Sequence, residues 1–349
     1  MARFSLTELE LPIAQAPLAG GPSTPALAAA VGEAGALGFL AAGYKSVDAL
    51  RADLDDLRAR TARPFGVNVF APPGPPGDRA LVERYADALR AESERYGVAL
   101  GEPRHDDDAF AGKVALLVEE RPAVVSFTFG CPPPAVVDEL HEAEVAVWVT
   151  VTTPGEAQIA ARAGADALVV QGVEAGGHRG SFDDGAPGEV GLLALLQTVG
   201  TATDLPLVAA GGLATGRALA AVLAAGAAAA ALGTAFMLTP EAGTSTPHRA
   251  ALGGDAPTAL TRAFTGRLAR GITNRFMREH TGAPSAYPEL HHVTAPVRAA
   301  ARERGDADAI NLWAGQAYPL AEEVPAGDLV RRLAAEAREA LESAARGLR

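Results

Sequence analysis

Apolar and polar residues are distributed in blocks along the first two thirds of the chain. Short, almost continuously apolar runs are followed by longer Ala-rich segments whose apolar positions have helical spacing. Uninterrupted apolar runs are typical of parallel strands that are covered on both faces. The predicted strands occupy residues 13–20, 37–43, 65–70, 123–130, 145–151, 167–172, 205–212 and 229–237.

These eight strand–helix units lie within roughly 240 residues, which is the number and length expected of a (β/α)8 barrel. We therefore predict an α/β fold in which residues 1–240 form a TIM barrel. A doubly wound open sheet is the alternative. That fold more often has a G-x-G-x-x-G sequence after its first strand, and the segment LAGGPSTP does not have this spacing.

Two segments are longer than a minimal barrel requires, and both follow predicted strands. Residues 71–121 begin with a Pro/Gly-rich loop and continue as a helical insert, and residues 241–320 lack a strong strand signal and predict a mostly helical cap. Because barrel active sites lie at the carboxyl ends of the strands, we expect both segments to cover that face. Residues 321–349 have helical apolar spacing, and we expect this helix to pack back on the barrel.

Charge and composition exclude several classes of partner. The net charge of −12 and the pI of about 5.1 argue against nucleic acid, which requires basic patches. The longest apolar runs are too rich in Ala and Gly to span a membrane, and the N-terminus lacks a signal core, so we expect a soluble cytoplasmic protein. The single cysteine, Cys131, cannot form an internal disulfide and is interpreted as a small hydrophobe.

The sequence predicts no metal site. His291 and His292 are adjacent and therefore face different directions, and no Cys or carboxylate spacing completes a ligand set. Lys45 and Lys113 are the only lysines, which restricts Schiff-base chemistry because that chemistry needs an amine.

The most distinctive motif is VQGVEAGGHRG, which follows the sixth predicted strand. Gln171 ends this strand, and Gly176 and Gly177 allow the backbone to approach a ligand closely. His178 then lies over the mouth of the barrel. We interpret it as the candidate catalytic residue, although a histidine fixed by its own loop hydrogen bonds is the alternative.

The seventh and eighth strands end in glycine-rich turns. Gly211 and Gly212 follow one strand, and Gly233 and Thr234 follow the next. Phosphate sites of barrels frequently lie at these two loops, where backbone N–H groups converge on an anion. Together with the glycine pair one strand earlier, these turns predict the phosphate anchor of a cofactor that lies across the mouth.

Other predicted strand ends suit a flat heteroaromatic ring. The side-chain amides of Asn68 and Gln171 can both donate and accept hydrogen bonds, as the edge of a pyrimidine-like ring requires. Thr150 ends the fifth strand, and the first strand end offers the backbone of Ala16, Pro17 and Leu18. Each of these residues could instead be a simple polar cap.

In their order along the chain, the segments APLAGG, GVNVF, VQGVEAGGH, AAGGLATG and ALGTAF resemble the nitronate monooxygenases, formerly called 2-nitropropane dioxygenases. The resemblance spans roughly residues 12–320. It implies FMN as cofactor, bound by Asn68, Gln171, Gly176, Gly212 and the stretch Leu232–Thr234, with His178 as the active-site histidine. Leu18 stands where many members have Met.

The resemblance also implies the reaction, in which alkyl nitronates such as propionate 3-nitronate are oxidised with O2 to carbonyl compounds and nitrite. We expect a monomer or homodimer with small-molecule partners only. An arginine of the cap, for example Arg267 or Arg270, is a candidate for binding a substrate carboxylate. His178 could act as an imidazolium that attracts the nitronate or as a neutral base toward a nitroalkane.

Four alternatives remain open from the sequence. An FMN-dependent enoyl reductase shares the EAGGH motif, and an NAD(P)H:quinone reductase could use the same scaffold. A flavin-free isomerase or aldolase barrel would use the phosphate loops for its substrate and would be colourless. A non-catalytic binding barrel would be indifferent to replacement of His178.

Overall fold

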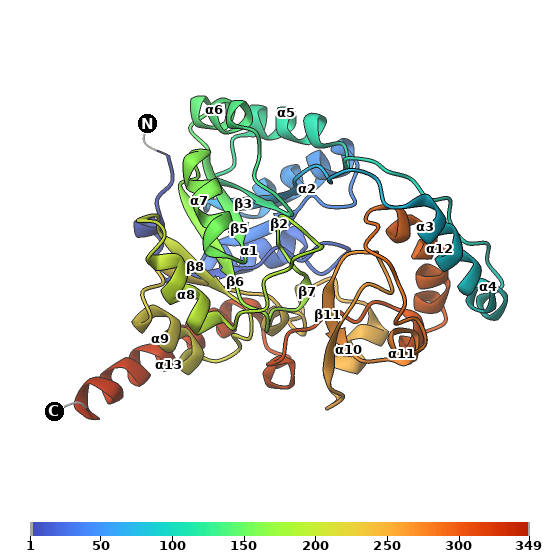
Figure 1. Cartoon of the computed structure of the whole chain (residues 1–349). Helices are drawn as coiled ribbons and strands as arrows, with labels where there is room; N and C mark the ends of the chain where they lie inside the picture. Colours follow the sequence, from blue (N-terminus) through green and yellow to red (C-terminus); the bar gives the residue numbers. More distant parts are fainter. Residues whose placement is uncertain (1–2, 348–349) are drawn as a thin grey trace.

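The computed structural model describes residues 3–347, and its centre is an eight-stranded parallel barrel (Figure 1). Each strand is only three to six residues long, as their short apolar runs predicted. The strands are β1 (Ile13–Gln15), β2 (Gly38–Ala41), β3 (Phe65–Phe70), β4 (Val124–Thr128), β5 (Ala146–Val151), β6 (Ala167–Gln171), β8 (Leu207–Ala210) and β9 (Ala229–Leu232).

The order of the strands closes the sheet on itself. The hydrogen-bonded order is β1-β9-β8-β6-β5-β4-β3-β2, and β1 meets β2 through a parallel bridge between Ala14 and Leu37. The amide of Gln15 donates to the carbonyl of Leu37, and the amide of Leu37 donates to the carbonyl of Ile13. The predicted TIM barrel is therefore confirmed, and the open sheet is excluded because the two terminal strands are joined.

Helices cover the outside of the barrel and follow the strands in sequence. Several begin at a Thr or Ser whose side chain accepts a backbone N–H of the first turn, and at Thr153 a capping box with Glu156 is complete. The last helix contacts α9 and α1. The barrel helices are α1 (Pro25–Glu33), α2 (Val47–Arg60), α5 (Phe110–Glu120), α6 (Pro134–Glu142), α7 (Pro154–Arg162), α8 (Leu192–Gly200), α9 (Gly216–Ala224) and α13 (Ala326–Gly347).

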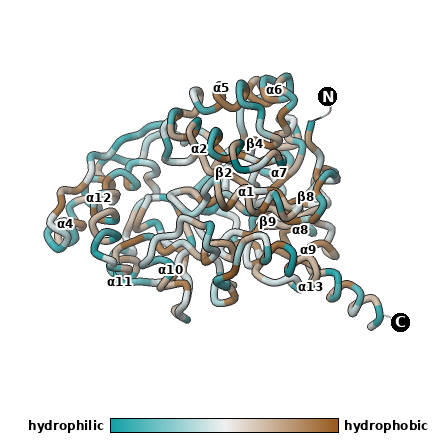
Figure 2. Tube along the Cα trace, turned by 180° about the vertical axis from the view of Figure 1, so that it is seen from behind, coloured by the Kyte–Doolittle hydropathy of each residue, from teal (hydrophilic) through white to brown (hydrophobic). Residues whose placement is uncertain are grey.

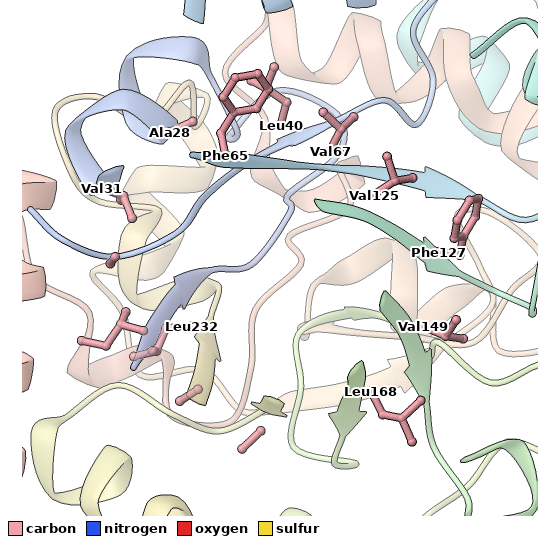
Figure 3. Packing of buried hydrophobic residues seen from close by; sticks show 14 of the residues in the cluster. Ala28, Val31, Leu40, Phe65, Val67, Val125, Phe127, Val149, Leu168 and Leu232 are labelled. Carbon is pink, nitrogen blue, oxygen red and sulfur yellow. The ribbon is translucent and has the colours of Figure 1, made fainter. Parts of the chain in front are cut away.

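Alternate residues of the strands build two separate apolar layers. Val67, Val125 and Val149 point outward and pack in the layer between strands and helices (Figure 3). The barrel interior is filled by a smaller cluster in which the rings of Phe39 and Trp148 lie 5.7 Å apart, and alanines of β1, β5, β6, β8 and β9 contribute small side chains. Large side chains opposite small ones fill the interior without a pore.

A second apolar cluster holds the cap together beside the mouth of the barrel. The insert after β3 contributes α3 and α4, which pack against α12 of the later segment, and Figure 1 shows these helices together on the side away from both chain ends. The cap helices are α3 (Arg79–Ala88), α4 (Arg90–Tyr96), α10 (Thr246–Leu252), α11 (Arg275–Glu279) and α12 (Glu289–Glu303), and single 3-10 turns occur at Leu6–Glu8, Thr234–Phe236, Ala307–Ala309 and Tyr318–Leu320.

The cap also contains a three-stranded antiparallel sheet that the sequence did not predict. Strands β10 (Thr258–Thr261) and β11 (Ala269–Ile272) pair with each other, and β11 pairs with β7 (Gly177–His178). Residues 241–320 were expected to be mostly helical, but the segment TRAFTGRLARGITNRFMREH within them is helical only at α11. Its strands are too short to show a period of two, and β7 consists of a glycine and the candidate histidine.

Hydropathy follows this architecture. In Figure 2 the apolar colour is concentrated along the barrel strands, while α12, α4 and the end of α13 alternate between polar and apolar positions. Within residues 3–347, no helix combines the length and the apolar character needed to cross a membrane.

Candidate active site

A cavity of about 500 Å³ opens at the carboxyl ends of the barrel strands, below the cap. It brings together residues that the sequence singled out from six different strand ends. The site residues predicted from the sequence that line it are Ala16, Pro17, Leu18, Asn68, Thr150, Gln171, Gly176, Gly177, His178, Gly211, Gly212, Gly233 and Thr234. Leu232 does not line the cavity, because its side chain is buried in the layer between strands and helices.

His178 lies at the meeting point of barrel and cap. Its Nε2 is 2.9 Å from the hydroxyl of Thr265, and its backbone pairs with Ala269 in the cap sheet. The rings of Phe129 and Trp313 contact the imidazole nearly edge-on, with centroids 5.6 and 5.4 Å away. The imidazole is thus held in one orientation by a hydrogen bond and by aromatic walls.

The surroundings keep His178 neutral. Burial, together with the positive charge of Arg267, lowers the pKa of its imidazole to about 3. A histidine with this pKa is unprotonated at neutral pH. The arrangement therefore favours a neutral imidazole over an imidazolium, a choice that the sequence left open.

Gln171 and Arg179 hold the loop that presents His178. The amide Nε2 of Gln171 donates to the carbonyl of His178, and its Oε1 accepts the backbone N–H of Gly180. The guanidinium of Arg179 donates to the same Oε1 and to the carbonyls of Gly172 and Gly188. Arg179 is almost completely buried, and its guanidinium fixes the backbone of its own loop.

Gly176 has no room for a side chain. A Cβ atom at this position would lie 2.4 Å from the backbone nitrogen of Gly315, which belongs to the segment WAGQ near the end of the cap. The amide of Gly315 in turn donates to Oγ1 of Thr234 at the end of β9. The loops after β6 and β9 are therefore locked together by a cap segment, and this close approach requires glycine.

The turns after β8 and β9 form a cradle of free amides. Gly211 and Gly212 both have positive φ, at 114° and 68°. The backbone N–H groups of these two residues and of Gly233 and Thr234 donate to no other group within residues 3–347. Unpaired N–H groups at successive turns, next to the start of α9, are the arrangement that binds a phosphate. The helix N-terminus itself is capped by Thr215.

The opposite wall carries polar side chains from β3, β4 and β5. The Nδ2 of Asn68 donates to the carbonyl and hydroxyl of Ser126 and to the hydroxyl of Thr128, which is 3.3 Å from the hydroxyl of Thr150. This network holds the Asn68 amide at the cavity wall. Its Oδ1 accepts no hydrogen bond from the described residues and remains available to a ring N–H.

The two arginines proposed from the sequence do not line the cavity. Arg267 is buried, donates to the carbonyls of Arg179 and Ser181, and stacks over the ring of Phe129 at 4.1 Å. Arg270 donates to the carbonyl of Val173. Both therefore act on the backbone of the loop that carries His178. The sequence suggested them because both arginines belong to the cap segment that was expected to cover the mouth of the barrel.

Arg298 and Arg302 of α12 line the cavity instead, together with Tyr44, His248 and His291. The sequence analysis missed them because nothing in the pattern of α12 shows which of its faces meets a cavity. None of the lining residues in the part of the chain that the structure describes is Asp or Glu. The chain as a whole is acidic, with a net charge of −12, but the described lining of this cavity has no carboxylate.

Two other groups are accounted for without chemistry at the site. Burial raises the pKa of the Cys131 thiol to about 11, so this cysteine is protonated and a poor nucleophile.

Within residues 3–347, one cluster of possible metal ligands occurs, formed by Glu92, Glu279 and His280. Arg275 binds both of its carboxylates, at 2.5 to 2.8 Å, which explains the cluster as an ion-pair network.

The fold is that of a TIM barrel, and its mouth combines free backbone amides with a lining in which no described residue is Asp or Glu. A family model described as "Nitronate monooxygenase" matches residues 3–336. The chain belongs to the nitronate monooxygenase family, and the protein is an oxidoreductase of a flavoenzyme family.

Individual relatives agree with this assignment. A nitronate monooxygenase of Pseudomonas aeruginosa is 41% identical over 350 residues, which cover 96% of this chain and 99% of the relative. The crystal structure of a nitroalkane oxidase from Streptomyces ansochromogenes is 51% identical and superimposes with a TM-score of 0.93, covering 97% of this chain and 98% of that one. Family and neighbour support the oxidation of nitronates as the class of reaction.

A second solved structure has the same fold but is less similar in sequence. FabK from Thermotoga maritima is 30% identical, with a TM-score of 0.76, and the match covers 99% of this chain and 97% of that one. The lower similarity shows a more distant relationship than that to the nitroalkane oxidase.

Proposed function

We propose that the protein binds FMN and uses it to oxidise alkyl nitronates with O2, with propionate 3-nitronate as a representative substrate, to carbonyl compounds and nitrite. The observation that carries this proposal is the position of a neutral, rigidly held His178 above a cavity whose far end is a cradle of unpaired amides. An anionic cofactor and an anionic substrate both suit a cavity without carboxylates.

The residues present fit FMN. The free N–H groups of Gly211, Gly212, Gly233 and Thr234 would hold its phosphate. Asn68, with a free Oδ1, would contact the edge of the ring. Gln171 is engaged with the His178 loop through both ends of its amide, so its main task is to fix that loop. When bound, the flavin supplies the redox chemistry, and the protein positions it.

The neutral state of His178 fits a nitronate substrate. A nitronate is already the deprotonated form of a nitroalkane, so no strong base is needed to start the reaction. The imidazole can form a hydrogen bond to the nitronate, and toward a neutral nitroalkane it can accept the α-proton. Phe129 and Trp313 wall off the imidazole with apolar surface. They restrict the access of water to the reacting carbon.

The absorption spectrum of the purified protein tests the cofactor. We expect the spectrum of an oxidised flavin, released as FMN on denaturation, and bleaching when propionate 3-nitronate is added without oxygen. A colourless protein that cannot be reconstituted with FMN would contradict the proposal and favour a flavin-free isomerase or aldolase.

The EAGGH motif, which FMN-dependent enoyl reductases share, keeps a reductase as the second candidate. The same anaerobic bleaching experiment distinguishes the two functions. Fast bleaching by NADH or NADPH with no response to nitronate would identify an enoyl or quinone reductase. Bleaching by nitronate with a slow response to both nicotinamides is the result that we expect.

A further inference from the structure

The cavity contains a buried positive charge that no carboxylate balances. Arg298 lies on α12, lines the cavity and is 7% exposed. No Asp or Glu within residues 3–347 forms an ion pair with it. The other buried arginines of the described residues, Arg179, Arg267 and Arg270, donate to backbone carbonyl oxygens of the loop that carries His178 and do not line the cavity.

The neighbours of Arg298 hold its guanidinium in place but do not saturate it. Nε donates to Oγ1 of Thr294, one Nη to Oδ1 of Asn311, and the other Nη to the carbonyl of His291. A further contact of 3.3 Å joins this second Nη to Nδ1 of His291. A guanidinium has five N–H groups, so at least one remains for a ligand. Burial lowers the pKa of Arg298 to about 10, and the group is still charged at neutral pH.

Arg298 is separated from His178 by one layer of side chains. The ring of Tyr287 lies 5.9 Å from the imidazole of His178 and 6.4 Å from that of His291, which contacts Arg298. A ligand group next to His178 is therefore not the group that meets Arg298. A substrate would reach both residues only with a second polar group, a few atoms away from its reacting carbon.

We propose that Arg298, oriented by Asn311 and Thr294, binds a carboxylate at the far end of the substrate and makes the enzyme selective for nitronates that carry one. This inference rests on the proposed function. The residue type fits, because the planar guanidinium fork matches a carboxylate and retains its charge when buried. A buried unpaired charge is unfavourable, and an anionic ligand removes that penalty.

Two nitronates of the same carbon number test this proposal. Propionate 3-nitronate and 1-propyl nitronate differ only at the end away from the nitronate, where the first has a carboxylate and the second has a methyl group. For Arg298→Gln we expect kcat/KM for propionate 3-nitronate to fall by at least about tenfold, mainly through KM, because a charge-assisted hydrogen bond is lost. The value for 1-propyl nitronate should change less than about threefold.

The ratio of the two kcat/KM values is the decisive quantity, because it does not depend on how much of a variant is folded or loaded with flavin. Arg298→Lys keeps the charge but loses the fork, and we expect an intermediate ratio. Arg84→Gln is the matched control, since it removes the same charge from an exposed position of α3. An unchanged ratio in Arg298→Gln, whether or not both values fall, would overturn the proposal.

A binding measurement separates failure of this inference from failure of the proposed function. Succinate has the shape of propionate 3-nitronate, and butyrate lacks its second charge. By calorimetry, we expect the wild-type protein to bind succinate at least about tenfold more tightly than butyrate, and Arg298→Gln to lose this preference. If neither nitronate is oxidised but this preference is seen, the reaction is wrong and the carboxylate site stands. Equal affinities in the wild type would reject the site.

Discussion

Nε2 of His178 and Oγ1 of Thr265 lie 2.9 Å apart, although the two residues are 87 positions apart in the chain. Thr265 is buried, and its hydroxyl also contacts the backbone of Arg267 at 3.3 to 3.4 Å. The cap therefore supplies the hydrogen-bond partner that orients a histidine presented by the barrel. This relationship makes Thr265 a positioning residue whose influence passes through His178.

Replacement of Thr265 tests that relationship. We expect Thr265→Val to lower kcat for nitronate by about 3- to 10-fold, the range for one neutral hydrogen bond, and to alter the pH profile of kcat. Thr265→Ser keeps the hydroxyl and should restore both. Thr198→Val, on the exposed face of α8, is the matched control. A serine variant as impaired as the valine variant would show that the methyl group, and not the hydroxyl, matters.

His178→Ala should separate binding of the flavin from turnover. The residue belongs to the wall of the cavity and not to the amide cradle, so we expect FMN to remain bound. Turnover of nitronate should fall by about 10- to 1000-fold, the range for one acid–base or electrostatic group. The flavin spectrum and the steady-state rate are measured on the same sample. Wild-type turnover in the variant would remove His178 from the mechanism.

Gly212 offers a test of the phosphate cradle. Its φ is +68°, and a Cβ would lie 3.0 Å from that of Glu174. Gly212→Asp should expel FMN, because it places a negative charge and a side chain where the phosphate would bind. Gly226→Asp is the control, since Gly226 also has positive φ, at 98°, but no atom lies within 4 Å of its Cβ position.

The flavin content of the two variants is read from the ratio of absorbance in the visible to that of the protein. We expect Gly226→Asp to remain yellow despite its strained backbone. A yellow Gly212→Asp protein would contradict the placement of the phosphate at the turn after β8.

Three histidines at the cavity predict that the protein loses stability in acid. Burial lowers the pKa of His178 to about 3, of His248 to about 4 and of His291 to about 2. Because these values lie below the unfolded value of about 6.5, the unfolded chain binds more protons as the pH falls, and the free energy of unfolding decreases below that value.

His248 isolates one contribution, because its Nε2 is 3.1 Å from the carbonyl of Trp313 and we assign it no part in the reaction. At pH 5 the uptake of a proton by an unfolded histidine of this kind costs about 2 kcal/mol of stability. His248→Gln should therefore lose about 2 kcal/mol less than the wild type between pH 7.5 and pH 5 in urea unfolding. Identical pH dependence in both proteins would show that His248 is not kept neutral.

The parts of the fold that local sequence determines were predictable. Apolar runs such as Val124–Thr128 and glycine turns such as Gly211–Gly212 show their role within a few residues. The amide cradle follows from the same turns, since consecutive barrel strands bring their ends to one mouth.

The rest depends on contacts between distant segments. β11 is a strand because it pairs with β10 and with Gly177–His178, not because ARGI has a strong strand pattern. Arg298 and Arg267 are both cap arginines in the sequence, and only tertiary packing turns one toward the cavity and the other toward the backbone of Ser181. No spacing rule within the chain distinguishes these two environments.

Because β7 pairs with β11, the position of His178 depends on the position of the cap. Ala269 is in register with His178, and Arg270 with Gly177. A hinge motion that lifted this cap strand as a rigid flap would pull the imidazole out of place or break the pairing. Transplanting the cap from one relative to another would accordingly require the two residues of β7 to travel with it, as a single cassette.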